Sequence, residues 1–287
     1  MKKFLVLTLL VGLLLTACGD KAQQEESTGT NSKENQTAQT SETEESTDGS
    51  LDGIKERGFI TLGTSAEYPP YEWHNIDGSK DEIIGVDIEI AKAIAEDLGV
   101  ELKIKDMQFD GLLPALNANE MDFVIAGMAA KPERMEAVDF SHPYTSQEQL
   151  LLVRSEDADK YKSPSDLKGK NIGTQLGSTQ EMYAKENFEK EGATVTALPD
   201  NNNIVMELKN QTFDAVFMSG IPANKFASMQ EGLKVVDIGA PPEDAYAIAV
   251  KKGNKSLVDA INKVVDKLNE DGSVKNWEKE YIELTEK

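Results

Sequence analysis

Short apolar runs alternate with amphipathic segments along most of the chain, and this rhythm predicts strands followed by helices. The first apolar run, at 59–64, has the length of one strand. The segment at 87–98 then repeats apolar residues at helical spacing, with Ile88 and Ala91 on one face. Gly99 follows it, where a glycine commonly ends a helix. We therefore expect a strand at 59–64 and a helix at 87–98.

The rhythm continues and then restarts, which predicts two α/β units. The first unit is expected to add strands at 100–104 and 123–127 around a helix at 112–117. After Tyr144, the second unit is expected to hold strands at 171–175, 193–198 and 214–218 and helices at 179–190 and 204–209. A last strand at 245–250 and helix at 256–268 have no obvious partner there, so the simplest arrangement returns them to the first unit.

The fold class that this order favours is α/β with two lobes. Each lobe is expected to hold a mixed, mainly parallel sheet flanked by helices, because strands separated by helices form such sheets. Lobe 1 would comprise residues 51–144 plus 245–287, and lobe 2 residues 145–244. The chain would then cross between the lobes near 144–149 and near 240–246, and these crossings would act as hinge strands.

The chain begins with a segment that is typical of export. Lys2 and Lys3 precede an uncharged run at 4–17, which is too short to cross a bilayer of about 30 Å as a helix. We interpret residues 1–17 as a signal peptide. Cys18 ends a Leu-Thr-Ala-Cys run that resembles a bacterial lipobox, so its thiol is expected to carry a lipid. A plain secretory signal is the alternative, and no internal disulfide is possible because there is one cysteine.

Residues 18–50 lack the side chains that build a core. From Asp20 to Ser50 the chain contains no Val, Ile, Leu, Met or aromatic residue. Such a segment buries too little apolar surface to offset its chain entropy, so we expect a disordered tether between the membrane and the folded body. An interaction tail with a partner of its own is the alternative.

Composition argues against several functions. The chain holds 51 acidic and 30 basic residues, a formal net charge of -21, which would repel phosphate backbones. We therefore expect no nucleic-acid binding. Only two histidines occur, and the sequence contains no G-x-S-x-G elbow, P-loop or H-E-x-x-H motif. The chain is accordingly expected to be no enzyme and to bind no cofactor or metal.

Five segments resemble the polar-amino-acid-binding proteins of ABC importers, which form solute-binding protein family 3, and they occur in that family's order. They are GTSAEYPPYE at 63–72, GVDIEIA at 85–91, FDGLLPAL at 109–116, MDFVIAGM with PER and DFS within 121–141, and GTQLGSTQE at 173–181. The resemblance implies a type II periplasmic-binding fold that holds its ligand in a cleft between two lobes.

The resemblance also implies a function, that of the extracytoplasmic substrate-binding subunit of an ABC importer. Such a subunit would capture an amino acid or amino-acid-like solute and deliver it to separate permease subunits. The chain would be a monomer, held at the bacterial cell surface by a lipid on Cys18. Two alternatives stay open: an exported dehydratase-like enzyme, in which Glu67 would act as acid or base, and an adhesin or sensing module that reuses the fold.

Arg134 is the expected partner of the ligand carboxylate. A free amino acid is a zwitterion, and a planar guanidinium can pair with both carboxylate oxygens, as the resemblance implies for this position. A surface ion pair with Glu133, Glu136 or Asp139 is the alternative.

Gly127, Met128 and Ala129 follow a predicted strand, at the edge where open α/β sheets bind their ligands. The resemblance implies ligand contacts from this stretch. The Gly127 carbonyl would face the ammonium group, and the Ala129 N–H would face the carboxylate.

Lobe 2 and two aromatic residues are expected to complete the site. Ser178 and Thr179 open a predicted helix whose N–H groups attract anions, although either hydroxyl could instead cap the helix. Tyr68 and Phe109 resemble the aromatic residues that sandwich the ligand side chain, and a core position is the alternative for Phe109. Ser219 is expected to reach the ligand when the lobes close.

Two site positions depart from the family's usual pattern. Many members place Ser or Thr at Ala129 and an acid at Ser219, so the ligand ammonium lacks its usual ionic partner here. Either another carboxylate takes that role, with Glu67, Glu243 and Asp244 as candidates, or the ligand is unusual.

The side chain of the ligand is left open by the sequence. Ser65 replaces an acid that some members direct at cationic side chains, which weakens the case for lysine or arginine.

Overall fold

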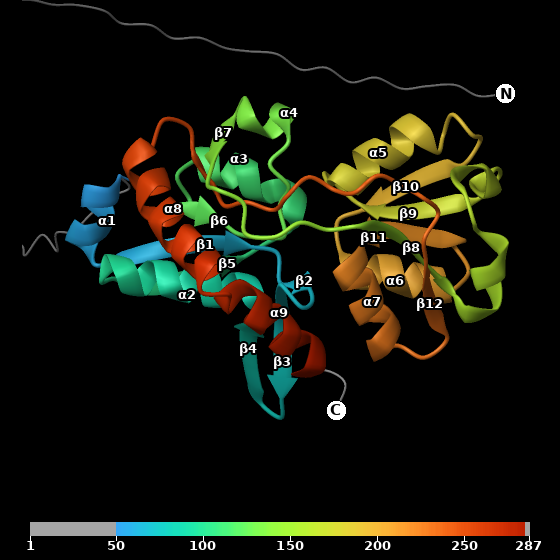
Figure 1. The fold of residues 1–287 in the computed structure, drawn as a ribbon, viewed down its shortest axis with the longest axis horizontal. Helices are drawn as coiled ribbons and strands as arrows, with labels where there is room; N and C mark the ends of the chain where they lie inside the picture. The colour runs from blue at the N-terminus through green and yellow to red at the C-terminus, as the bar shows by residue number, and fades with distance from the viewer. Residues whose placement is uncertain (1–49, 285–287) are drawn as a thin grey trace, which may run out of the picture. The chain divides into compact units, whose positions relative to one another are not determined.

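The computed structural model describes residues 50–284 of the 287, and these form two five-stranded sheets and one smaller sheet (Figure 1). The predicted signal peptide, lipidated Cys18 and tether lie outside the described residues. Within the described part of the chain, no helix is long and apolar enough to span a membrane.

Lobe 1 is built on a sheet with the strand order β5-β1-β6-β13-β7. Its strands are β1 (Phe59–Thr64), β5 (Glu101–Asp106), β6 (Phe123–Val124), β7 (Val138–Phe140) and β13 (Ala249–Lys251). β1 pairs in parallel with β5 and β6, whereas β13 runs antiparallel to β6 and β7. A strand from near the end of the sequence therefore lies within the lobe 1 sheet. This agrees with the prediction that it returns to the first unit because it has no partner in the second.

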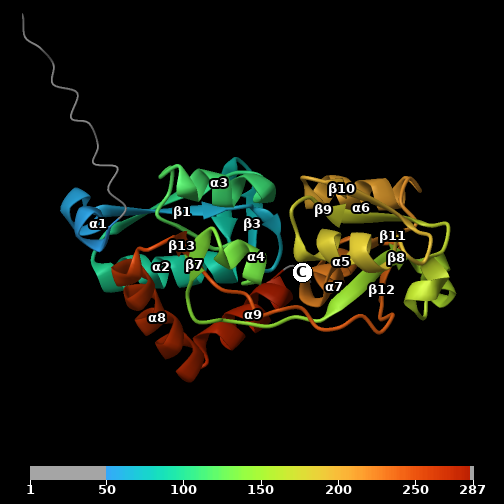
Figure 2. The same cartoon turned by 90° about the horizontal axis from the view of Figure 1, so that it is seen from above.

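Helices cover both faces of the lobe 1 sheet (Figures 1 and 2). They are α1 (Leu51–Arg57), α2 (Val86–Leu98), α3 (Leu112–Asn117), α4 (Pro132–Met135), α8 (Lys255–Glu270) and α9 (Ser273–Leu284). Ile60 and Phe123 pack in one cluster with α2 and α8, while Val124 packs with α3 on the other face. Because both faces are covered, the inner strands β1 and β6 are mostly buried, whereas the edge strand β5 is polar and largely exposed.

Lobe 2 is built on a sheet with the order β10-β9-β11-β8-β12. Its elements are β8 (Gln149–Arg154), β9 (Asn171–Gln175), α5 (Thr179–Asn187), β10 (Thr194–Leu198), α6 (Asn201–Lys209), β11 (Ala215–Ser219), α7 (Gly220–Met229) and β12 (Leu233–Val236). β9 runs parallel to β10 and β11, and β8 runs antiparallel to β11 and β12. Phe188 beside α5 and Phe226 of α7 belong to separate clusters, one for each face of the sheet.

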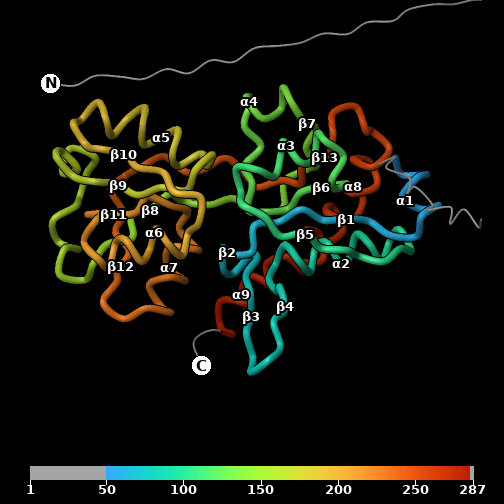
Figure 3. The backbone as a smooth tube through the Cα atoms, turned by 180° about the vertical axis from the view of Figure 1, so that it is seen from behind, coloured from blue at the N-terminus to red at the C-terminus, as the bar shows by residue number. Residues whose placement is uncertain are grey.

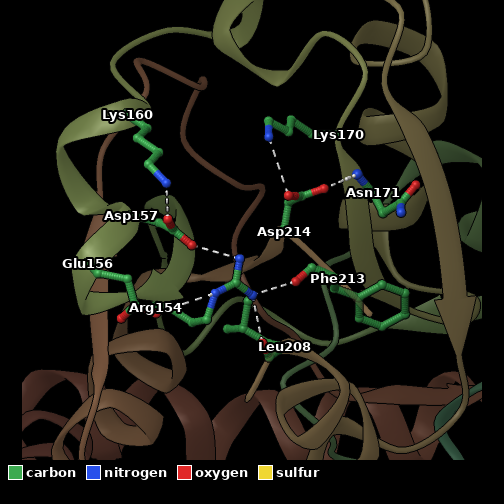
Figure 4. Close-up of polar contacts among 9 residues, drawn as sticks. All are labelled: Arg154, Glu156, Asp157, Lys160, Lys170, Asn171, Leu208, Phe213 and Asp214. Atoms are coloured by element: carbon green, nitrogen blue, oxygen red, sulfur yellow. Dashed lines mark hydrogen bonds and ion pairs between the residues drawn. The ribbon is translucent and has the colours of Figure 1, made fainter. Parts of the chain in front are cut away.

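A polar cluster fixes one end of the lobe 2 sheet (Figure 4). Arg154 donates from Nη1 to the carbonyls of Leu208 and Phe213, each at 2.7 Å, and its Nη2 lies 2.6 Å from Asp157 Oδ2. These bonds join the end of β8 to the end of α6 and the start of β11. The opposite end of β11, at Ser219, pairs with Gln149 at the start of β8, where the chain enters lobe 2.

The two crossing segments lie side by side between the lobes (Figure 3). The N–H of Tyr246 donates to the carbonyl of Thr145 at 2.8 Å, and the N–H of Tyr144 donates to the carbonyl of Tyr246 at 2.9 Å. Further along, the N–H of Glu243 donates to the carbonyl of Gln147 at 2.9 Å. The lobes are therefore joined by two extended, hydrogen-bonded segments.

A small antiparallel sheet, β2-β3-β4, carries an aromatic residue of the candidate site. Its strands are β2 (Glu67–Tyr68), β3 (Glu72–Asp77) and β4 (Lys80–Ile84). The peptide bond between Pro69 and Pro70 is cis in the turn that follows Tyr68. The pattern of apolar residues does not predict this sheet, because the β3–β4 hairpin is mostly polar and exposed.

The predicted α/β fold with two lobes and mixed sheets flanked by helices is confirmed, and the strands at 59–64 and 171–175 match to the residue. The sheets are not mainly parallel as expected, because each five-stranded sheet has two parallel and two antiparallel pairings, the antiparallel ones made by β13 and by β8. The strand predicted at 123–127 is too long. Its regular pairing ends at Val124, and the chain turns at Gly127, whose φ is 52°.

Two other predicted elements are also too long, while the lobe boundaries stay predictions. The helix predicted at 179–190 ends at Asn187. The strand predicted at 245–250 begins only at Ala249, because Tyr246 makes isolated bridges with other segments instead of joining a strand ladder.

Candidate binding site

Arg134 connects the two lobes. The short helix α4 holds its side chain half-buried, with Nη1 donating to the Ala129 carbonyl at 2.7 Å and Nη2 donating to the Gly177 carbonyl of lobe 2 at 3.0 Å. Its Cζ lies 5.3 Å from the centre of the Phe109 ring. Burial lowers the pKa of Arg134 to about 10, against the opposing charge of Glu243, so the group stays cationic at neutral pH.

The surface ion pairs weighed for Arg134 do not form within residues 50–284. Asp139 instead lies 2.8 Å from Lys252 Nζ. The guanidinium therefore faces the junction of the lobes rather than the acids of its own segment.

Tyr68 and Gly127 meet on the lobe 1 side. A Cβ on Gly127 would lie 2.9 Å from Cε1 of Tyr68, so the absence of a side chain lets the ring pack on the backbone. Tyr68 is 9% exposed, and its hydroxyl lies 3.4 Å from that of Tyr246. The Tyr68 ring thus packs against the backbone turn at Gly127.

The buried carboxyl group of Asp87 holds the backbone turn at Gly127. The N–H of Gly127 donates to Asp87 Oδ2 at 2.8 Å, and Tyr144 OH donates to the same oxygen at 3.0 Å. Glu72 interacts with Asp87, and no donor among the described residues reaches either Glu72 oxygen or Asp87 Oδ1. Burial raises the pKa of Asp87 to about 6 and that of Glu72 well above its ordinary value. Burial and the charge of Asp87 therefore favour a Glu72 carboxyl that keeps its proton.

Sequence reasoning missed this carboxyl pair. Asp87 reads as a favourable acid in the first turn of α2, and Glu72 reads as a surface residue of a polar segment. Both are 0% exposed. Burial of an acid has no signature in residue spacing, so only the tertiary structure reveals the pair.

The first turn of α5 faces lobe 1. Ser178 caps the helix, because its Oγ accepts the N–H of Glu181 at 3.0 Å and donates to the Gln175 carbonyl at 2.7 Å. This bears out the capping alternative for Ser178, and a ligand contact from it stays a prediction. The side chain of Thr179 does not cap the helix, because its Oγ1 donates to Glu243 Oε1 at 2.6 Å.

Ser219, at the end of β11, lies beside Thr179 and Glu243. It is 0% exposed and donates to Glu243 Oε2 at 2.6 Å. Tyr246 OH and Gln180 Nε2 donate to the Ser219 oxygen, at 2.7 and 3.1 Å. Burial raises the pKa of Glu243, and the bonds from these polar neighbours lower it. We call Tyr68, Gly127, Arg134, Thr179, Ser219 and Glu243 the interlobe site.

Phe109 and Met128 lie mainly in the lobe 1 core. Phe109 is 8% exposed and packs with Leu112 and Val124, although its ring also faces Arg134. Met128 is 1% exposed in the same cluster, and its carbonyl accepts the N–H of Ala247 at 3.0 Å. The core alternative for Phe109 therefore coexists with its place beside the site, and ligand contact from Met128 stays a prediction.

The three candidate replacement acids occupy different places. Glu67 Oε1 accepts Gln175 Nε2 at 3.0 Å, and burial, followed by the approach of Asp200, raises its pKa to about 9. Asp244 lies 2.7 Å from Lys131 Nζ and is exposed. Only Glu243 contacts Ser219 and Thr179.

No cluster of three or more His, Cys, Asp or Glu side chains within residues 50–284 is arranged to hold a metal ion. The polar groups of the interlobe site are one cation, one buried carboxyl and several hydroxyls. Such a set is suited to a small ligand that carries both charges.

The chain is similar in sequence to known proteins. The profile of the bacterial extracellular solute-binding proteins, family 3, matches residues 60–284. The arginine-binding extracellular protein ArtP of Bacillus subtilis is 33% identical over 239 residues, which cover 83% of this chain and 90% of that protein. The L-cystine-binding protein TcyJ of Escherichia coli is 30% identical over 227 residues, which cover 79% and 84%.

Solved structures of amino-acid-binding proteins are also similar to this chain. The amino acid ABC transporter substrate-binding protein AbpA of Streptococcus pneumoniae, bound to L-arginine, matches with a TM-score of 0.79 at 32% identity, over 82% of this chain and 99% of that chain. An ancestral amino acid-binding protein, described as a precursor of cyclohexadienyl dehydratase, matches with a TM-score of 0.74 at 32% identity, over 81% and 99%.

Proposed function

Because this chain belongs to the bacterial extracellular solute-binding proteins of family 3, we propose that it is the substrate-binding subunit of an ABC importer for an amino acid or amino-acid-like solute. Several relatives are named for binding arginine, cystine or histidine. The proposed ligand class is accordingly an α-amino acid.

The position of Arg134 carries the proposal. Its guanidinium spans the junction of the lobes and donates to carbonyls on both sides. These two bonds use two of its five N–H groups. A ligand carboxylate would replace neutral carbonyls by a charged acceptor, and charge-assisted bonds are about twice as strong as neutral ones. The first turn of α5 adds the backbone N–H groups of Thr179 and Gln180, while the N–H of Gly177 already donates to Glu181 Oε2 at 2.6 Å.

Closure of the lobes around the ligand is the proposed mechanism. The paired crossing segments act as the hinge, and Tyr68 and Phe109 hold the ligand side chain on lobe 1 before Thr179 and Ser219 arrive from lobe 2. A ligand that contacts both lobes favours the closed state over the open one by the free energy of its extra contacts. The permease subunits then recognise the closed, loaded form.

The proposed location is the outer face of the cell membrane. A diacylglycerol on Cys18 anchors the protein, residues 18–50 act as a tether, and the binding body works as a monomer. Family membership supports an extracytoplasmic place, while the anchor and the monomeric state rest on the sequence.

A thermal-shift screen of the L-amino acids and L-cystine tests the proposal, because a ligand that binds only the folded state raises the unfolding temperature by mass action. At least one member is expected to shift wild type. Arg134→Ala should then lose about 2–4 kcal/mol of affinity for it by calorimetry, and Arg134→Lys less. A screen without any binder, or an Arg134→Ala variant with wild-type affinity, would contradict the proposal.

One observation favours a second candidate, an exported dehydratase. The raised pKa of Glu67, about 9, would keep a protonated acid near the interlobe site, and one structural neighbour is described as a dehydratase precursor. Loss of the absorbance of a cyclohexadienyl carboxylate on incubation with the protein would support it. Reversible binding without product would support the importer subunit.

A further inference from the structure

Glu243 is a buried acid that is held by neutral groups. The residue is 9% exposed, with Oε1 accepting from Thr179 and Oε2 accepting from Ser219 at 2.6 Å and from Tyr246 OH at 3.2 Å. Within residues 50–284 it makes no salt bridge, in contrast to its exposed neighbour Asp244. The second crossing segment thus places a carboxyl group inside the interlobe site without a protein cation bound to it.

A buried carboxylate of this kind is incompletely compensated. Hydroxyl donors recover part of the free energy that removal from water costs, whereas a bound cation recovers more. Burial accordingly raises the pKa of the Glu243 carboxyl. A cationic group delivered between the lobes would complete the site.

The two charges of the interlobe site are separate from each other. Arg134 and Glu243 interact electrostatically, but the guanidinium bonds are made to the carbonyls of Ala129 and Gly177. An α-amino acid presents a carboxylate and an ammonium group on adjacent atoms of one carbon skeleton. A site with one cation and one anion on different segments matches both groups at once.

We propose that Glu243 binds the α-ammonium group of the ligand, a role that the uncharged Ser219 cannot fill. Ser219 and Thr179 orient the carboxylate through their hydroxyls. This inference rests on the proposed amino-acid-binding function. It makes Glu243 the residue that selects amino acids against carboxylic acids of the same shape without an amino group.

The test compares an amino acid with its α-hydroxy acid on two variants. L-Arginine with its hydroxy analogue is the first pair, and the strongest binder of the amino acid screen with its own hydroxy analogue is the second. Glu243→Gln removes the charge at nearly constant shape, and Asp244→Asn is the matched control at the adjacent exposed acid. Calorimetry gives the affinities of wild type and both variants for each pair, and circular dichroism checks folding.

Glu243→Gln should weaken the amino acid about 30- to 3,000-fold and the hydroxy acid less than about threefold, because only the amino acid loses a charged partner. Asp244→Asn should bind both as wild type does. Equal losses for both ligands, or no loss, would overturn the role of Glu243 while leaving the proposed function intact. Wild type that binds no amino acid would overturn the function itself. If Glu243→Gln does not fold, Glu243→Met, which also removes the charge at similar volume, supplies the same comparison.

Discussion

Replacing Glu72 with Gln should stabilise the protein at alkaline pH. Glu72 and Asp87 face each other at 0% exposure, and no neighbouring donor among the described residues reaches Glu72 or Asp87 Oδ1. Two neighbouring carboxyls can form a hydrogen bond only if one of them is protonated, so the Glu72 proton must be retained as the pH rises. The Glu72→Gln side chain needs no such proton, since its amide NH₂ can donate to Asp87 at every pH.

Asp87 gives a pH dependence that wild type and the variant share, because burial is the main cause of its raised pKa. Its pKa rises from 3.8 to about 6 in the folded state, which corresponds to about 3 kcal/mol. Since the folded pKa is raised, burial of Asp87 costs no stability below about pH 4, where the group is protonated in both states. The free energy of unfolding then falls as the pH rises through about 6. Glu72 adds a loss of the same sign, because its pKa is also raised. Glu72 costs wild type about 1.4 kcal/mol for each pH unit above its ordinary pKa of about 4.5 over which only the folded protein keeps this proton, and Glu72→Gln removes that loss.

Urea unfolding of the protein without added ligand, at about pH 4.5 and about pH 8, measures this difference. Glu72→Gln should be more stable than wild type at about pH 8 by roughly 1–3 kcal/mol, and no more stable at about pH 4.5. Glu82→Gln, at an exposed position of β4, should follow wild type at both values. A Glu72→Gln variant that is destabilised equally at both pH values would refute a proton retained on Glu72.

Three further predictions concern other positions. Gly127→Ala should weaken amino acid binding at least about tenfold by calorimetry, because φ is 52° and the new Cβ would lie 2.9 Å from the Tyr68 ring; unchanged affinity would contradict this. Glu67→Gln should raise the melting temperature at about pH 8 but not at about pH 4.5, since the raised pKa costs stability as the pH passes from about 4.5 to about 9; an equal shift at both values would disagree. Asp122→Ala should cost about 3–5 kcal/mol in urea unfolding, because it removes a buried carboxylate that pairs with Arg57 and accepts the Thr61 N–H at 2.7 Å; a loss under about 1 kcal/mol would contradict this.

Elements with local signals are predictable from the sequence. The helix at 87–98 is set by its amphipathic spacing and by Gly99, which adopts φ 71° and donates back to the Ala95 and Glu96 carbonyls. The strand at 171–175 is bounded by polar and turn residues. The final strand lies in lobe 1, as its lack of a partner in lobe 2 predicts.

Elements that depend on long-range pairing were missed. β8 is an almost uninterrupted apolar run, yet it directly follows the expected hinge, and its pairing with β11 and β12 joins segments far apart in the sequence. α7 has a proline near its start and little amphipathic contrast. Neither local propensity nor periodicity identifies such elements when packing decides them.

For the site, the sequence identifies the residue types but not all of their arrangement. Arg134, Thr179 and Ser219 are expected near one another and lie at the junction of the lobes. The segment that carries Glu243 is equally compatible with a solvated loop, and the structure buries this acid instead. Acids are rarely buried without partners, so spacing alone could not single out Glu243 from the 51 acidic residues.

A crystal structure with the strongest amino acid binder of the screen tests the central claim most directly. We expect the ligand carboxylate within about 3 Å of the Arg134 guanidinium and beside the first turn of α5. The guanidinium should then have exchanged at least one of its bonds to the Ala129 and Gly177 carbonyls for a ligand oxygen. A bound amino acid located elsewhere, with Arg134 still bonded to both carbonyls, would contradict this assignment of the binding site.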